Sequence, residues 1–448
     1  MALSGLDIFK RLPKTNCGEC GFPTCMAFAM KLAARQSELD KCPYVSDEAR
    51  EELAEASAPP IRKIEIGTGE SAFKIGEETV MFRHEKTFVN PPGFGVLISD
   101  SADEAAIANA AKKVDDVAFE RVEQMLKPKV VALSNGSGNP DKFVAAVKVI
   151  QGVTSAPLVL MSSSVDNLRA ALAECAANRP LIHAADASNY EAMAGLAKEF
   201  NVPLAIKADD LAALADLSEK VQAAGVKDIV LDPSVGAGNA GLADIVRTRR
   251  AALKQKFKPL GFPMITFPAL ATDDPDVEMV LAGVHLMKYA GLIILSDLDP
   301  ARVLPLLVLL QNIYTDPQKP MQMSEGIYKI GEPKDDSPVL ITTNFSLTYF
   351  IVSGEVEASR VPVWLCVMDV EGLSVLTAWA AGKFVPEKIA QFVNKSAVAD
   401  KVKHRKLVLP GYVAQISGEL DEELPEWQVA VGPREAGDLP HYLKQWSA

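Results

Sequence analysis

Short runs of apolar, mostly β-branched residues alternate with amphipathic stretches along the middle of the chain. The apolar runs are 96–99, 130–134, 158–161, 181–183, 204–206, 229–231, 264–267 and 292–295. The stretches with helical periodicity between them include 139–151, 165–177, 188–199, 209–224, 241–256, 277–289 and 301–313. Strands that are apolar throughout are typical of parallel sheets covered on both faces. The repeated strand–helix unit therefore predicts a (β/α)8 TIM barrel, with an open doubly wound sheet as the alternative.

The chain on either side of this barrel predicts smaller units, so the fold class is α/β and multidomain. Residues 1–58 predict a small N-terminal module, and the barrel domain is expected to span 59–314, with a hairpin of strands at 63–67 and 78–83 before the repeats. A proline-rich, charged stretch predicts a linker at 315–336. Residues 337–448 predict a Rossmann-like or flavodoxin-like domain with strands at 339–342, 363–368, 406–409 and 428–431.

Composition limits the classes of function. The chain has 46 Lys and Arg residues against 58 Asp and Glu residues, a formal net charge of −12, which argues against nucleic acid as a partner. The most apolar run, 303–310, is too short to span a bilayer, so no membrane association is expected. No signal-peptide pattern precedes Cys17, so a cytoplasmic localisation without disulfides is expected.

Four of the six cysteines lie in a short N-terminal segment. Cys17, Cys20, Cys25 and Cys42 form the pattern C-x2-C-x4-C-x16-C-P. Two thiolates separated by two residues can bind one metal centre, and a proline after the last cysteine is typical of iron–sulfur sites. The pattern therefore predicts an iron–sulfur cluster, [4Fe–4S] first of all, with these four cysteines as its metal ligands. A zinc site is one alternative, although zinc sites usually pair two C-x2-C motifs; four core cysteines are the other.

The second α/β domain has a candidate ligand site where its strands end. In open α/β sheets, ligands bind beyond the carboxyl ends of the strands. The candidate binding residues in those segments are Thr342, Thr343, Asn344, Ser346, Leu347, Thr348, Gly372, Leu373, Ser374, Val375, Thr377, Ala378, Pro410, Gly411, Tyr412, Val413, Ala414, Gly432, Pro433 and Arg434. These segments are rich in glycine and small hydroxyl residues and contain no His, Cys or paired acids. They favour binding of a large cofactor over acid–base catalysis, although turn and cap chemistry would explain the same composition.

The predicted barrel has polar loops after two of its strands. Asn135 follows the second strand, and the loop 232–239, which begins with Asp232, follows the sixth. Pterin-binding barrels place Asp and Asn at strand ends, so a substrate site is one interpretation. Helix capping and tight turns are the other, because Asp and Asn are favoured N-caps.

Several segments together resemble one family. Residues 15–29, the predicted barrel, and the segments Thr342-Thr343-Asn344 and Gly411-Tyr412-Val413 are similar to the large (gamma) subunit of the corrinoid iron–sulfur protein. That family belongs to the reductive acetyl-CoA (Wood–Ljungdahl) pathway. The resemblance covers the whole chain in domain order. It implies a [4Fe–4S] cluster on the four N-terminal cysteines and a corrinoid, of the cobalamin type, bound by the C-terminal domain.

The resemblance also implies a methyltransferase-type component of a multi-protein system and no catalytic residue of the chain's own. The corrinoid cobalt, as Co(I), would accept a methyl group from methyltetrahydrofolate through a separate methyltransferase and pass it to acetyl-CoA synthase. The cluster would reduce Co(II) back to Co(I). The implied protein partners are the small subunit in a heterodimer, the methyltetrahydrofolate:corrinoid methyltransferase, and CO dehydrogenase/acetyl-CoA synthase.

The histidines bear on how a corrinoid would be held. Many corrinoid proteins supply a cobalt ligand from a D-x-H-x-x-G motif, and none of His84, His183, His285, His404 or His441 lies in one. The expected corrinoid is therefore base-off, without a protein histidine ligand, which makes Co(II) easier to reduce. By the resemblance, Ser374, Thr377 and Ala378 would lie near the lower face of the ring.

Two other interpretations of the sequence stay open. The first is a pterin-dependent methyltransferase that uses Asp232 and Asn135 in its own barrel. The second is an iron–sulfur and flavin electron-transfer protein whose C-terminal domain binds the flavin.

Overall fold

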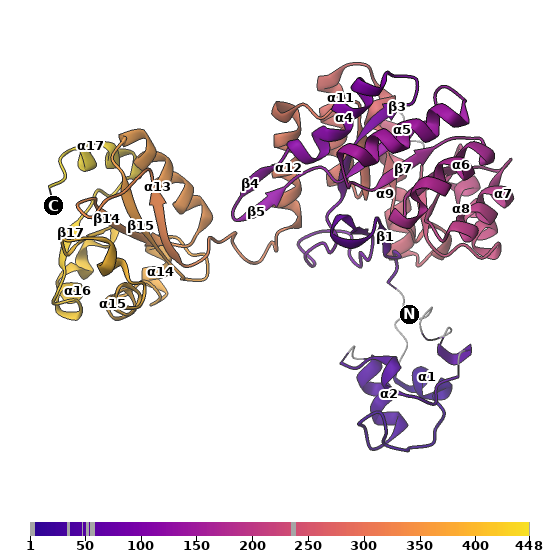
Figure 1. The fold of residues 1–448 in the computed structure, drawn as a ribbon. Coiled ribbons are helices and arrows are strands. Elements are labelled where there is room, and N and C mark those ends of the chain that lie inside the picture. Colours follow the sequence, from indigo (N-terminus) through magenta and orange to yellow (C-terminus); the bar gives the residue numbers. More distant parts are fainter. Residues whose placement is uncertain are drawn as a thin grey trace. The chain divides into compact units, whose positions relative to one another are not determined.

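The computed structural model describes residues 5–33, 36–46, 48–50, 53, 59–233 and 239–447. The chain forms two compact units, each taken by itself below (Figure 1). The first comprises Met1–Met81, Val89–Val117 and Pro128–Leu306, and the second Phe82–Phe88, Ala118–Lys127 and Leu307–Ala448. Within the described residues, no helix is long and apolar enough to cross a membrane.

The N-terminal module has little regular structure. Its described elements are the helices α1 (Gly5–Arg11) and α2 (Cys25–Ala33) and the 3-10 turn η1 (Leu39–Lys41). A small core forms around Phe28, which is fully buried together with Ala29, and Ile8 and Leu12 pack against it. Cys25 and Cys42 belong to the same core.

A short antiparallel hairpin precedes the barrel strands. β1 (Ile64–Ile66) pairs with β2 (Phe73–Ile75), and their inward side chains pack against the strands of the barrel. The strand predicted at 78–83 is absent; the partner of β1 is 73–75, where apolar residues alternate with an exposed lysine. A side-chain contact holds the segment that follows β2: Arg249 donates a hydrogen bond of 2.7 Å to the carbonyl of Val80.

The barrel consists of eight parallel strands. They are β3 (Gly93–Ser99), β6 (Val130–Ser134), β7 (Leu158–Met161), β8 (Leu181–Ala185), β9 (Leu204–Lys207), β10 (Ile229–Asp232), β11 (Ile265–Thr266) and β12 (Leu292–Leu295). Their order is β10-β9-β8-β7-β6-β3-β12-β11, and a parallel bridge between Leu231 and Met264 brings the two edges together. The predicted TIM barrel is confirmed, with an almost closed sheet.

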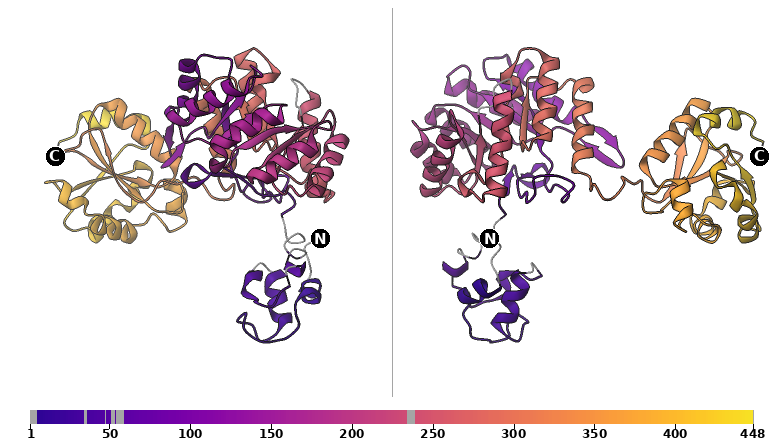
Figure 2. Two further views of the ribbon diagram at one scale, coloured as in Figure 1. Left: turned by 45° about the vertical axis from the view of Figure 1, so that its right-hand side comes forward. Right: turned by 180° about the vertical axis from the view of Figure 1, so that it is seen from behind.

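Helices lie on the outside of this sheet (Figure 2). They are α4 (Glu104–Asp116), α5 (Pro140–Val153), α6 (Val165–Cys175), α7 (Tyr190–Phe200), α8 (Leu211–Ala223), α9 (Asn239–Lys254), α10 (Pro268–Ala271), α11 (Pro275–Met287) and α12 (Pro300–Tyr314). Most begin where a capping side chain predicts it; Asp103, for example, accepts a hydrogen bond of 2.8 Å from the amide of Ala106 at the start of α4. The sequence analysis did not anticipate α4 or the short α10.

The second unit contains a five-stranded sheet. Its strands are β13 (Gly326–Ile330), β14 (Val339–Thr343), β15 (Val363–Met368), β16 (Lys406–Leu409) and β17 (Gln428–Val431), in the order β13-β15-β14-β16-β17. β14 to β17 are parallel and have the flavodoxin-like order, whereas β13 is antiparallel to β15. β13 lies within the stretch 315–336 that the sequence predicts to be a linker.

Helices cover both faces of this sheet. Residues of α13 (Ser346–Ser359) and α17 (Leu439–Lys444) belong to the core on one face, and residues of α14 (Val375–Ala380), α15 (Pro386–Lys395) and α16 (Ser417–Glu423) to the core on the other. This arrangement buries each strand on both sides, as the apolar runs predict.

A hairpin from far earlier in the chain belongs to the same unit. β4 (Phe119–Arg121) and β5 (Gln124–Leu126) are joined at Val122 and Glu123. The Glu123 carboxylate accepts hydrogen bonds from the Ser324 amide, at 3.2 Å, and from the Tyr328 hydroxyl, at 2.6 Å. The segment leading into β13 is thereby fastened to the hairpin.

Candidate cofactor-binding sites

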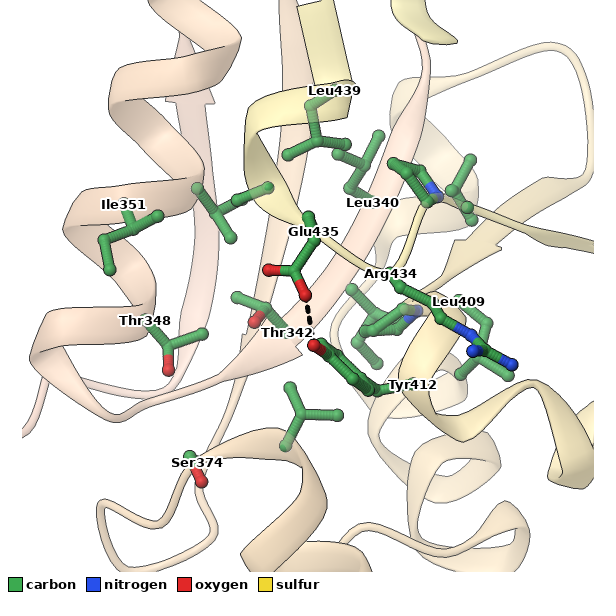
Figure 3. Close-up of a pocket in the computed structure, with 18 of the residues that line it drawn as sticks. Leu340, Thr342, Thr348, Ile351, Ser374, Leu409, Tyr412, Arg434, Glu435 and Leu439 are labelled. Atoms are coloured by element: carbon green, nitrogen blue, oxygen red, sulfur yellow. Dashed lines mark hydrogen bonds between the residues drawn. The ribbon is translucent and has the colours of Figure 1, made fainter.

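A cavity lies at the carboxyl edge of the C-terminal sheet, where the strand order reverses. From β14 the chain continues to β15 on one side, and β16 lies on the other. Ligands of open α/β sheets bind at such a switch point. The cavity has a volume of about 390 Å³ (Figure 3). Its lining residues are Leu340, Ile341, Thr342, Thr348, Ile351, Val352, Ser374, Val375, Leu376, Val408, Leu409, Pro410, Tyr412, Gly432, Pro433, Arg434, Glu435, Ala436 and Leu439.

Part of the predicted residue set meets in this cavity. The predicted residues that line it are Thr342, Thr348, Ser374, Val375, Pro410, Tyr412, Gly432, Pro433 and Arg434. The predicted residues outside its lining are Thr343, Asn344, Ser346, Leu347, Gly372, Leu373, Thr377, Ala378, Gly411, Val413 and Ala414. Ala378 and Val413 are fully buried in the core of the unit, and Leu347 is exposed on α13. Each of the four predicted strand-end segments thus contributes predicted residues to the cavity lining.

Asn344 supports the cavity without lining it. Its side chain is buried at the end of β14. Its Oδ1 accepts hydrogen bonds from the amides of Val370, at 3.1 Å, and Gly372, at 3.0 Å, while its Nδ2 donates to Asp369 at 2.9 Å. One amide side chain therefore fixes the loop after β15 just before Ser374 enters the cavity wall.

Two glycines allow the loops after β16 and β17 to touch backbone to backbone. A Cβ atom on Gly411 would lie 2.5 Å from the carbonyl oxygen of Gly432 and 2.7 Å from the carbonyl carbon of Pro433. The Gly411 amide donates a hydrogen bond of 3.0 Å to the Pro433 carbonyl. This close approach, which side chains larger than glycine would prevent, forms the cavity wall at Tyr412 and Gly432.

The sequence analysis missed most of the apolar lining and one charged group. The missed residues are Leu340, Ile341, Ile351, Val352, Leu376, Val408, Leu409, Glu435, Ala436 and Leu439. Ile351 could have been found from helix α13, because its apolar residues Leu347, Phe350 and Ile351 are exposed. A helix that is apolar on its solvent side indicates a surface that something covers.

Tyr412 and Glu435 form the polar contact at the cavity. The Tyr412 hydroxyl donates a hydrogen bond to Glu435 Oε1 (Figure 3). This bond and the negative charge of Glu435 raise the pKa of Tyr412 above its usual value. The hydroxyl is thus held in its protonated, donating form beside the Glu435 carboxylate.

The N-terminal cysteines lie in one module, at different depths. Cys25 and Cys42 are buried, Cys20 is half-buried and Cys17 is exposed. Gly18 and Gly21 have positive φ values of 79° and 84°, and the Gly21 amide donates to the Gly18 carbonyl, so the chain turns tightly between Cys17 and Cys20.

Asn16 makes two hydrogen bonds with Cys25. The Asn16 amide donates a hydrogen bond of 3.4 Å to Cys25 Sγ, and the Cys25 amide donates to Asn16 Oδ1 at 2.8 Å. Hydrogen bonds to sulfur are among the factors that set the potential of iron–sulfur sites. Among the described residues, no three Cys, His, Asp or Glu side chains lie close enough together to hold a metal ion. Cys20, Cys25 and Cys42 belong to one small core, and the exposed Cys17 lies outside it.

The barrel mouth contains the polar residues of the pterin interpretation. Asn135 donates to Asp100 Oδ2 at 2.7 Å and accepts from Asn167 Nδ2 at 2.6 Å, so its amide is engaged within the protein. Asp232 is buried and its Oδ2 lies 2.8 Å from His183 Nε2. Of the loop 232–239, residues 234–238 lie outside the described residues. Asn135 and Asp232 thus each form hydrogen bonds with other side chains of the barrel.

Comparison with known proteins shows which family the chain belongs to. A family model described as "CO dehydrogenase/acetyl-CoA synthase delta subunit" matches residues 63–443, and one described as "Putative Fe-S cluster" matches residues 12–44. The corrinoid/iron-sulfur protein large subunit of Moorella thermoacetica is 44% identical over 444 residues, which cover 99% of each chain. The chain belongs to the family of corrinoid/iron–sulfur protein large subunits.

Archaeal proteins belong to the same group of relatives. The acetyl-CoA decarbonylase/synthase complex subunit gamma of Methanopyrus kandleri is 36% identical over 458 residues, covering 99% of this chain and 98% of the relative. Among solved structures, dihydropteroate synthase from Xanthomonas albilineans in complex with 7,8-dihydropteroate matches with a TM-score of 0.37 and 14% identity, over 51% of this chain and 95% of that one. The large-subunit family, matched over the full chain, is therefore the relationship that bears on function.

Proposed function

We propose that this chain is the cofactor-bearing large subunit of a methyl-transfer system of the acetyl-CoA pathway. A corrinoid bound at the C-terminal cavity supplies a cobalt centre for moving a methyl group from methyltetrahydrofolate, by way of a separate methyltransferase, to acetyl-CoA synthase. A [4Fe–4S] cluster on Cys17, Cys20, Cys25 and Cys42 supplies the electron that keeps the cobalt in its reactive oxidation state. The activity is thus that of a methyltransferase-type component rather than of a self-sufficient enzyme.

The observation on which the proposal rests is the cavity at the switch point of the flavodoxin-like sheet. Its walls are mostly apolar and hydroxyl side chains with one arginine and one glutamate, and the described lining residues include no histidine, cysteine or pair of acids. Such a site provides binding and orientation, and leaves the chemistry to a cofactor.

The cavity fits part of a corrinoid in size, and its lining fits that part in polarity. A cavity of about 390 Å³ is in the range of small-molecule pockets and smaller than a complete corrinoid, so only part of the group enters it. The remainder requires an apolar surface at the opening. Ile351, Leu376 and Tyr412 line the cavity and are also partly exposed, at 49%, 43% and 41% of their surface.

The chain's own residues bind and orient the group. Thr342, Thr348 and Ser374 place hydroxyl groups in the wall, each able to donate or accept a hydrogen bond. Gly432 packs closely against β16, where a Cβ atom would lie 2.9 Å from Val408 Cγ1. Asn344 fixes the loop that presents Ser374, as its hydrogen bonds to Val370 and Gly372 indicate. Rigid placement of these groups lowers the entropic cost of binding.

The cysteine module fits an iron–sulfur cluster by its donor chemistry. Cys20, Cys25 and Cys42 belong to one small core, the free thiol of Cys17 is exposed in the same module, and the Asn16 N–H donates to Cys25 Sγ. Binding requires the exposed Cys17 and the half-buried Cys20 to converge with the buried pair. Thiolate–metal bonds contribute to the free energy of folding, so the module should be more stable with the cluster than without it.

The implied partners follow from the proposal. The small subunit would complete a heterodimer, and the methyltransferase and CO dehydrogenase/acetyl-CoA synthase would be the proteins that exchange the methyl group with it.

Metal analysis with an absorption spectrum, on anaerobically purified chain co-expressed with a small subunit, tests the proposal. About one cobalt and four irons per chain are expected. Thr348→Trp, which fills the cavity, should lower the cobalt content and spare iron, whereas Ala358→Trp, on the exposed side of the same helix, should change neither. Iron without cobalt, with or without a flavin spectrum, would overturn the carrier role, and zinc in place of iron would overturn the cluster.

A further inference from the structure

Glu435 is the one carboxylate among the cavity-lining residues of the described chain. It follows the segment Gly432–Arg434 at the carboxyl end of β17 and precedes the 3-10 turn η7 (Ala436–Asp438). Figure 3 shows its carboxylate directed into the cavity, toward the hydroxyl of Tyr412. Arg434 is the other charged residue of the lining, and the remaining lining residues are apolar, hydroxyl-bearing or glycine. A carboxylate in such a cavity costs desolvation when a ligand covers it, unless the ligand provides donors.

The hydrogen bond from Tyr412 leaves most of this carboxylate available. An ionised carboxylate only accepts hydrogen bonds and has about four lone-pair sites, of which the Tyr412 hydroxyl occupies one. The neighbouring Arg434 also lines the cavity, but its side chain extends away from the Glu435 carboxylate (Figure 3). The group that a bound ligand meets beside Tyr412 is therefore an acceptor with a negative charge.

We infer that Glu435 determines specificity among corrinoids by the groups on their periphery. Its carboxylate accepts a hydrogen bond from the N–H of a peripheral amide, and it weakens the binding of a corrinoid that has a carboxylate at the same position. This inference rests on the proposed function, and it adds the chemical form of the ligand that the site selects.

The chemistry of the ligand class explains why such a residue matters. The edge of the corrin ring carries acetamide and propionamide arms, whose NH2 groups donate hydrogen bonds. Hydrolysis of one amide to an acid keeps the shape of the arm, and replaces a neutral donor by an anion. Two carboxylates in contact repel, and like charges in an interface are a common means of excluding a wrong ligand. Apolar walls also disfavour the acid, because its charge loses solvation, and Glu435 adds a repulsion that depends on its own charge.

Binding titrations of the cofactor-free full-length chain test the inference. The ligands are cobalamin and its monocarboxylic acid isomers, in each of which one propionamide is hydrolysed. The parent chain should bind one isomer about threefold to tenfold more weakly than cobalamin, the isomer whose acid meets Glu435. Glu435→Gln keeps the size of the side chain, removes its charge and can donate to a carboxylate, so it should bind that isomer and cobalamin about equally.

One further variant serves as a control, and another tests the hydrogen bond at Glu435. Glu422→Gln, an exposed position on α16 outside the cavity lining, should keep the discrimination of the parent. Tyr412→Phe removes the hydroxyl that competes for the carboxylate and should retain or increase the discrimination. Circular dichroism spectra would establish that each variant is folded.

The possible failures are distinguishable. Equal binding of all isomers by the parent, or unchanged discrimination in Glu435→Gln, would overturn the role of Glu435 while the carrier function stands. A folded parent chain that binds neither cobalamin nor its acids would overturn the proposed function, and this inference with it.

Discussion

The side-chain oxygen of Asn344 accepts a hydrogen bond of 3.0 Å from the amide of Gly372, 28 residues later in the chain. The same oxygen accepts from the amide of Val370 at 3.1 Å. Asn344 directly follows β14, and the two amides belong to the loop that follows the neighbouring strand β15. A single buried amide therefore connects the two strand ends on one side of the switch point and defines the start of the segment that brings Ser374 to the cavity.

Replacing Asn344 should destabilise this loop and weaken ligand binding. Asn344→Ala leaves the buried amides of Val370 and Gly372 without their acceptor, which should cost about 2–4 kcal/mol in the free energy of unfolding of the C-terminal unit. Chemical denaturation monitored by circular dichroism measures this loss, and a corrinoid titration measures the change in affinity.

Asn344→Asp provides the matched comparison. The carboxylate can still accept from both amides, but it replaces the Nδ2 group that now donates to Asp369 at 2.9 Å and sets two acids against each other. A destabilisation comparable to that of the alanine variant is expected at neutral pH, with partial recovery when the pair takes up a proton at low pH. Parent-like stability of Asn344→Asp at neutral pH would contradict the role assigned to Nδ2.

Gly411→Ala should deform the cavity wall. The new Cβ would approach the Gly432 carbonyl oxygen to 2.5 Å, so the loops after β16 and β17 would have to separate. We expect a lower melting temperature and weaker corrinoid binding, measured by calorimetry and titration. Gly418→Ala, in helix α16, meets no atom within 4 Å and should be neutral or stabilise by about 0.5–1 kcal/mol. Unchanged affinity in Gly411→Ala would show that the wall at Tyr412 and Gly432 does not contact the ligand.

Much of the architecture is predictable because buried parallel strands are apolar on both faces. The runs at 130–134, 158–161, 292–295 and 363–368 coincide with strands β6, β7, β12 and β15. The order of the C-terminal strands then places all four strand ends on one edge of the sheet, which is why residues as distant as Thr342 and Arg434 could be predicted to meet.

The missed features lack a periodic signal or depend on contacts distant in sequence. β4 and β5 have three residues each, and their turn places Val122 and Glu123 at positive φ without the glycine or asparagine that usually indicates such a turn. Glu435 is an exposed acid in sequence terms, and only the folded loops bring it to Tyr412. The supporting role of Asn344 depends on amides more than 25 residues away, which no local pattern reveals.

Replacing one exposed cysteine should remove the cluster with little effect on the packing of the module. Cys17 is exposed, so Cys17→Ser leaves no cavity, yet it removes one of the four proposed thiolate ligands. We expect loss of most of the iron and of the brown absorption, measured after anaerobic purification. Cys175→Ala, a buried thiol on α6 of the barrel, should retain the iron. A full iron content in Cys17→Ser would exclude Cys17 as a ligand.

His285 should make the barrel sensitive to acid. It is buried on α11, its Nδ1 has no hydrogen-bond partner among the described residues, and burial lowers its pKa from 6.5 to about 4. Because the folded chain binds this proton less readily than the unfolded chain, stability is present at neutral pH and decreases as the pH falls from about 6.5 through about 4. The loss from this group should reach about 2 kcal/mol at pH 5. His285→Gln cannot titrate, so its urea-unfolding free energy should fall less between pH 7 and pH 5 than that of the parent. His84→Gln, at an exposed position, should follow the parent, and parallel pH profiles for the parent and His285→Gln would show that His285 stays neutral in both states or protonates equally in both.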